Sequence, residues 1–294
     1  MDTFYILLTG SLTAIVCSIV GSYLVVRGFA MVTDALSHSI VPGIALAFLF
    51  TGSRDIVPMF LGATIFGLLS TYLIETLQKK VRVQADASIG VTFTWFFSIG
   101  ILLISYYSGN IDLDLDCVLY GEIAFVPIDV LLINGVSYGP RSLWIIGITA
   151  VVIASTLFTT RKEMRLALFD PAFAVSVGII PVVWHYVLMT LVTLTTVASF
   201  EIVGSIIVIS LFIVLPASAY LLAKSLSSMI VLSSIFGIIA TCLGYYIAMY
   251  FNGSISGAIS IATGIIFAGC FLVYIVKKQS TSSILSLKQK SHFQ

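Results

Sequence analysis

The chain has 294 residues, of which 59% are hydrophobic and only 9% charged, and its formal net charge is +1. Its mean hydropathy of +1.13 is far above that of a water-soluble globular protein. This composition excludes an ordinary soluble domain, and the nearly neutral charge gives no indication of nucleic-acid binding.

Apolar runs long enough to cross a bilayer recur along nearly the whole chain. We expect spans at about 4–26, 36–52, 56–77, 89–107, 142–160, 178–198, 200–222, 228–250 and 257–276. The chain is therefore predicted to be an all-α polytopic membrane protein with about nine transmembrane helices. It is expected to form one membrane domain over residues 1–279, followed by a short polar tail over 280–294.

The distribution of basic residues predicts the orientation of these spans. All lysines and arginines except Arg54 and Arg141 fall on one side, and loops rich in such residues stay in the cytoplasm. The N-terminus is then outside and the C-terminal tail is cytoplasmic. Counting segment 118–134 as a span would break this parity. We therefore expect it to be a re-entrant or interfacial piece on the outer side.

An aspartate and a histidine stand four residues apart near the start of the second span. Positions i and i+4 share one face of a helix, so Asp34 and His38 can face the same object. Pro42 is expected to displace the carbonyl of His38, four residues earlier, which would add an oxygen to the patch. The sequence predicts a cradle for a divalent cation here, although Asp34 could instead simply cap the second span.

Other ionisable residues within spans are few, and intramembrane charges usually serve a function. His185 is either a second ligand on the cation pathway or an interfacial residue between two aromatic neighbours. Glu201 is either an acid at an outer gate or a solvated residue in a turn. Glu75 precedes a basic cluster and is expected to be a solvated charge at a helix end.

A short helix capped at both ends is predicted on the cytoplasmic side. Asp170 is placed as an N-cap, Pro171 as the first helical residue and Gly178 as the left-handed residue beyond the end. Such a rigid element between two spans suits contact with a cytosolic partner. A plain connector would show the same pattern.

Five stretches resemble one family in the same order along the chain: 33–47, 85–94, 116–123, 169–174 and 202–222. With them, the chain resembles the permease subunits of bacterial manganese, zinc and iron ATP-binding-cassette importers over essentially its full length. The extended segment 118–141 is most similar to the manganese and iron branch. Family members often have another small or polar residue near Leu215 and Pro216, so no role beyond a helix distortion is assigned there.

The resemblance implies a dimeric permease in the bacterial plasma membrane, homodimeric or heterodimeric, with cytosolic ATPase subunits and an extracytoplasmic metal-binding protein. Asp34 and His38 fall on the family's Asp-x-x-x-His motif of the metal pathway. The segment 166–178 would be the coupling element seated in the ATPase, with Asp170, Pro171, Ala172, Phe173 and Gly178 as its marked residues.

The chain is expected to be a transport subunit and not an enzyme, with no bound cofactor of its own. No GxxxxGK[ST] phosphate loop occurs in it, so ATP hydrolysis would belong to partner subunits. The alternative is a gradient-driven cation transporter or channel with Asp34, His185 and Glu201 as a relay. An intramembrane hydrolase is disfavoured because the chain lacks HExxH, GxSxG and paired intramembrane aspartates.

Overall fold

The long apolar runs of the sequence form long helices in the computed structural model, which describes residues 2–29, 31–52, 56–107, 123–133 and 136–291. The first half contains α1 (Asp2–Val26), α2 (Val32–Ser39), α3 (Val41–Thr51), α4 (Ile56–Lys79) and α5 (Ala85–Tyr107). A short connecting region follows, with the 3₁₀ turn η2 (Ile123–Phe125) and the antiparallel strands β1 (Val130–Ile133) and β2 (Val136–Pro140).

The second half begins with α7 (Arg141–Thr159), α8 (Arg161–Phe169), α9 (Pro171–Ser176) and α10 (Pro181–Ile209). It continues with the π-helix η3 (Ser210–Val214), α11 (Leu215–Leu222), α12 (Leu226–Phe251) and α13 (Ile255–Ser291). The buried core lies where α1, α10 and α12 meet their neighbours, with α5 packed at the edge against α2, α3 and α4.

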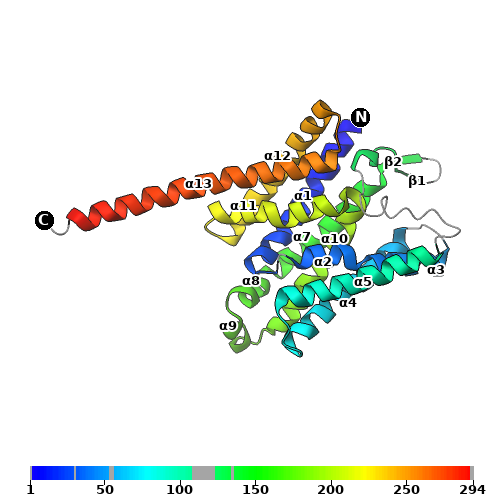
Figure 1. Ribbon diagram of the computed structural model, residues 1–294, viewed down its shortest axis with the longest axis horizontal. Helices are drawn as coiled ribbons and strands as arrows, with labels where there is room; N and C mark the ends of the chain where they lie inside the picture. Colours follow the sequence, from blue (N-terminus) through cyan, green and yellow to red (C-terminus); the bar gives the residue numbers. More distant parts are fainter. Residues whose placement is uncertain (1, 30, 53–55, 108–122, 134–135, 292–294) are drawn as a thin grey trace.

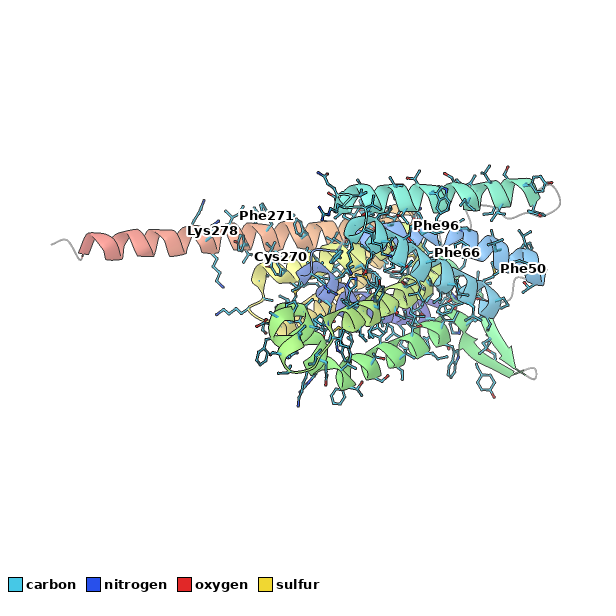
Figure 2. The ribbon with its side chains drawn as sticks, turned by 90° about the horizontal axis from the view of Figure 1, so that it is seen from below. Phe50, Phe66, Phe96, Cys270, Phe271 and Lys278 are labelled. Carbon is cyan, nitrogen blue, oxygen red and sulfur yellow. The ribbon has the colours of Figure 1, made fainter. Side chains whose placement is uncertain are left out.

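The two ends of the helix bundle carry different elements. Figure 1 shows the N-terminus and the strands β1 and β2 at one end, which we call the hairpin end. The helices α8 and α9 and the C-terminal part of α13 lie at the opposite end, which we call the basic end. In Figure 2, Phe50 at the end of α3 and Lys278 on α13 mark these opposite ends. The long helices therefore run between the hairpin end and the basic end.

Eight helical segments of the described chain are long and apolar enough to cross a membrane, and they match eight of the predicted spans. The remaining prediction, 200–222, departs from a single regular helix. The backbone kinks at Gly204, which has φ +78°, and Ile206–Leu222 follows as a shorter apolar helix that contains the π-helix η3. Glycine tolerates this φ because it has no Cβ. Further along the helix, Pro216 has no N–H to donate to the carbonyl of Phe212. The distortion predicted at Pro216 is thus confirmed.

The predicted re-entrant segment is only partly within the described residues, because 118–122 and 134 lie outside them. Its remainder forms η2 and β1 and contains no helix long enough to cross the membrane. Ile123 is fully buried, and η2 packs against α1, α10 and α13. At the C-terminus, α13 passes the predicted domain limit at 279 without a break, so residues 280–291 extend the last span as a helix.

Close helix crossings depend on small residues, as is usual in membranes. At the crossing of α3 and α4, Gly43 and Gly62 face each other so closely that a Cβ on either would overlap the backbone of the other. The aromatic rings of Phe66 and Phe96 then join α4 to α5 edge to face, with centroids 5.7 Å apart (Figure 2). These contacts hold the α2–α3 unit against α4 and α5.

We predict that Gly43→Ala destabilises the protein by about 1–3 kcal/mol, because backbone atoms opposite the new methyl group cannot move aside easily. Thermal unfolding in detergent would measure the loss. Gly264→Ala on α13 is the matched control, because a Cβ there meets no atom within 4 Å. Equal melting temperatures for the two variants would contradict the packing described here.

Candidate metal site and its surroundings

The helix that carries the predicted cation patch is short and ends at Ile40. α2 spans Val32–Ser39 with Met31 at its N-cap, so Asp34 is a helical residue and the alternative that it caps the span is wrong. Pro42 lies in the first turn of α3, so the predicted span 36–52 is divided at Ile40 between α2 and α3. The N–H of Ile40 donates to the carbonyl oxygen of Leu36 at 3.2 Å, and Pro42 has no N–H to donate to the carbonyl of His38.

Asp34 and His38 are the two residues of α2 that are not buried. Their side chains are 37% and 28% exposed, and Nε2 of His38 lies 3.7 Å from Oδ1 of Asp34. The His38 ring is bounded by Phe93 and Phe97 of α5, with ring centroids 5.9 and 5.3 Å away. The structure therefore confirms that the pair shares one face, and it places an aromatic wall beside it.

The donor set and its spacing fit a divalent metal ion. Two ligand atoms each about 2.1 Å from one metal lie about 3.4 Å apart at a tetrahedral angle, close to the observed 3.7 Å. Within the described residues, the buried Nδ1 of His38 has no hydrogen-bond partner. The same part of the chain has no group of three or more His, Cys, Asp or Glu placed to hold a metal. Two ligands are fewer than a metal ion requires, so any ion held by Asp34 and His38 would need further donors.

His185 lies elsewhere, in a buried cluster. The residue is 4% exposed, which argues against the interfacial interpretation. Its Nδ1 contacts the guanidinium of Arg27, and its Nε2 contacts Oε1 of Glu75. Both ring nitrogens are therefore occupied by protein partners in this conformation. Glu75 is itself 5% exposed, so the prediction of a solvated end charge is wrong.

Glu201 is remote from both groups. It stands sixteen residues after His185 on α10, a rise of about 24 Å along the helix axis. Its side chain is exposed near the kink at Gly204, within electrostatic reach of Arg141 and Asp129. The structure thus brings Asp34 and His38 together and keeps Glu201 apart from them at the hairpin end.

The short helix α9 has the predicted ends. The carboxylate of Asp170 accepts a hydrogen bond from the N–H of Phe173 at 2.9 Å, Pro171 is the first helical residue, and Gly178 has φ +82°. Ala172 is exposed and Ala174 is fully buried. Around α9 the basic end exposes five large apolar side chains: Phe169, Phe173, Val175, Val177 and Ile180. Several large apolar side chains exposed outside the spans are typical of a docking site.

Sequence reasoning missed the connection between Arg27, Glu75 and His185. A signal was available, because Glu75 stands within an apolar run and precedes Lys79 by four residues, which predicts an ion pair on one helix face. That pair is present, with Nζ of Lys79 2.8 Å from Oε2 of Glu75. The partners from α1 and α10 are distant in the sequence and could not be read from local spacing.

The fold and this site define a multi-pass helical membrane protein with a polar pair in its transmembrane region and an exposed helix at the basic end. The model of the ABC 3 transport family matches residues 3–276, and the chain belongs to that family.

Two relatives and one solved structure support the same assignment. The manganese transport system membrane protein MntD of Bacillus subtilis is 43% identical over 91% of this chain and 90% of its own length. The zinc transport system membrane protein TroD of Treponema pallidum is 37% identical over 93% of this chain and 73% of its own length. Among solved structures, PsaBC from Streptococcus pneumoniae in complex with Fab matches with a TM-score of 0.77 and 31% identity, covering 92% of this chain and 91% of that one.

We expect His38→Ala to weaken Mn²⁺ binding by the purified protein on the order of tenfold or more, because loss of even a residue that supports a ligand costs about that much. Isothermal titration in detergent would measure the affinity. Asp2→Asn, an exposed acid at the hairpin end, is the control and should bind as the wild type does. Unchanged affinity in His38→Ala would remove the histidine from the site.

Proposed function

We propose that this chain is the permease subunit of an ATP-driven importer of divalent metal ions, with manganese as the first candidate and iron and zinc as the others. The observation that carries the proposal is the Asp34–His38 pair, a partial metal site on an otherwise buried helix of a member of the ABC 3 transport family. The named relatives that transport manganese and zinc support the choice of cargo.

The chemistry of the pair agrees with this cargo. Carboxylate oxygen and imidazole nitrogen suit manganese, iron and zinc, whereas copper(I) prefers sulfur ligands. Two such ligands do not complete a coordination sphere. We infer that a second permease subunit, identical or paralogous, contributes the remaining donors across the pathway, together with water. Glu201 would act at the outer entrance, and His185 would lie beside the pathway as part of the buried cluster.

The polarity of the bundle supports an assignment of partners to its two ends. Lys79, Arg161 and Lys277 are among the many cations at the basic end, which by the positive-inside rule faces the cytoplasm. The N-terminus would then be outside and the end of α13 inside. Cytosolic ATPase subunits would bind at the basic end, and an extracytoplasmic metal-binding protein would deliver the ion at the hairpin end.

The helix α9 is the element through which the ATPase would act. It is short, capped by Asp170, and presents Phe173 at 53% exposure beside other apolar side chains. It also leads through Gly178 directly into α10, which packs against α2. Movement of α9 would therefore reach the helix that carries the metal pair.

Vesicles that hold the complete complex should accumulate manganese only when ATP is supplied. His38→Ala and Asp34→Asn should lower uptake on the order of tenfold or more, because the ion loses a ligand on its way. Uptake of radioactive manganese, with ATP hydrolysis followed in parallel, measures both the requirement for ATP and the effect of the two variants. Asp2→Asn serves as the control. Uptake by this chain alone, driven by an ion gradient without ATP, would establish the secondary transporter instead.

Phe173→Asp should reduce co-purification of the ATPase subunits on the order of tenfold, because a charge would replace a central apolar contact. Quantification of the ATPase bound to immobilised permease measures the change. Tyr250→Asp places the same charge at a more exposed aromatic position of the hairpin end, 82% exposed, and should leave ATPase binding intact. Normal binding by Phe173→Asp would exclude α9 as the main docking element.

A further inference from the structure

Two buried polar side chains and one half-buried arginine meet at the basic end and come from different parts of the fold. Glu75 belongs to the last turns of α4, His185 is the fifth residue of α10, and Arg27 directly follows α1. His185 contacts both of the others through its two ring nitrogens. Phe29 covers the group, with its ring 5.7 Å from that of His185 and 5.9 Å from the Arg27 guanidinium. We call these three polar residues the Arg–His–Glu cluster.

The contacts determine where the proton of His185 lies. A guanidinium can only donate, so Nδ1 of His185 must accept from Arg27. The neutral ring then carries its proton on Nε2, where it faces the carboxylate of Glu75. The cluster is thus a chain of contacts from cation to neutral ring to anion. Removing one member would leave a buried charge without its partner, which is strongly unfavourable.

The charges around the cluster argue against a metal ion there. Arg27 contacts the ring of His185, and Lys79 lies 2.8 Å from the second carboxylate oxygen of Glu75. A divalent cation would have to displace two positive side chains to reach two ligands. The cluster is therefore better suited to connect helices than to bind the transported ion.

The cluster lies between α9, the proposed docking helix, and α2, which carries Asp34 and His38. Its His185 stands on the second turn of α10, immediately after the α9–Gly178 connection. Its Arg27 opens the short loop into α2, seven residues before Asp34. Glu75 connects Arg27 and His185 to α4, which also packs against α2. A displacement of α9 and α10 would thus pull on the start of α2 through paired charges.

We propose that the Arg–His–Glu cluster is a latch that transmits the movement of α9 and α10 to α2, so that ATP hydrolysis is coupled to the opening of the Asp34–His38 site. This inference rests on the proposed importer function. His185 and Glu75 are positioning residues in this mechanism and do not touch the ion. An intact latch moves α2 together with α10, and a broken latch lets α10 move alone.

The first test compares wild type, Glu75→Gln and His185→Gln in the complete complex reconstituted in vesicles. The manganese ions imported per ATP hydrolysed should fall by about 2- to 30-fold in both variants, the range seen for residues that carry coupling between sites. Manganese affinity and co-purification of the ATPase should match the wild type, which would exclude misfolding. Lys79→Gln removes only the more exposed partner of Glu75 and should keep the wild-type ratio.

The exchange variant Glu75→His with His185→Glu provides a rescue. It places a carboxylate beside Arg27 and an imidazole on α4, so the helices stay linked by an opposite-charge contact. The transport ratio should recover most of its wild-type value. Wild-type ratios in the two single variants would overturn the latch. So would an equal fall in Lys79→Gln, because the effect would then be one of general charge.

A second readout does not depend on the cargo. Nitroxide labels at Met31→Cys, before α2, and at Ser176→Cys, at the end of α9, would be placed in a background whose four native cysteines are serines. ATP binding should change both spectra in the wild type and only the Ser176 position in Glu75→Gln. Identical responses at Met31 in both proteins would overturn the latch. If the wild-type complex imports no metal, the proposed function fails, whereas this comparison still tests the mechanical connection.

Discussion

The absence of water in the bilayer core is the constraint on which the whole structure depends. Every backbone polar group there needs a partner within the protein, so the chain crosses as helices. The helical ladder is interrupted at only a few points of the described spans, at Ile40, at Gly204 and in the π-helix η3, and each lies against other helices. At the last of these, Gly21 of α1 allows the backbone of Phe212 to approach closely. Irregular backbone is thus confined to protein-lined places, where it can serve transport.

The same constraint explains why the few polar side chains of the spans occur in groups. A lone buried charge is costly, whereas Glu75 is flanked by His185 and Lys79 and the ring of His185 also contacts Arg27. Asp34 and His38 show the opposite arrangement, because they are partly exposed and one buried nitrogen of His38 lacks a partner in the described chain. Both ring nitrogens of His185 contact charged side chains, whereas the partly exposed Asp34–His38 pair is accessible to a ligand.

The Arg–His–Glu cluster and the Asp34–His38 pair lie at comparable depths near the basic end, since both are within two turns of the loops at that end. One is joined to α9 through the start of α10, and the other is carried by α2, which packs against α10. A movement that begins at the basic end would therefore reach the Asp34–His38 pair through few intervening contacts. Glu201 lies about 24 Å from His185 along α10, at the hairpin end. One helix therefore connects both sides of the proposed pathway.

The sequence alone determined the features that depend on local chemistry. The length of the apolar runs defined eight of the nine predicted spans, the caps Asp170 and Gly178 defined the ends of α9, and the i,i+4 spacing put Asp34 and His38 on one face. Only the tertiary structure decided that Glu75 is buried and that His185 joins it to Arg27. Those contacts link residues up to 158 positions apart, and no local period encodes which helices become neighbours. Burial converts an ordinary charge at a helix end into a connection between three helices, and burial is a property of the assembled bundle.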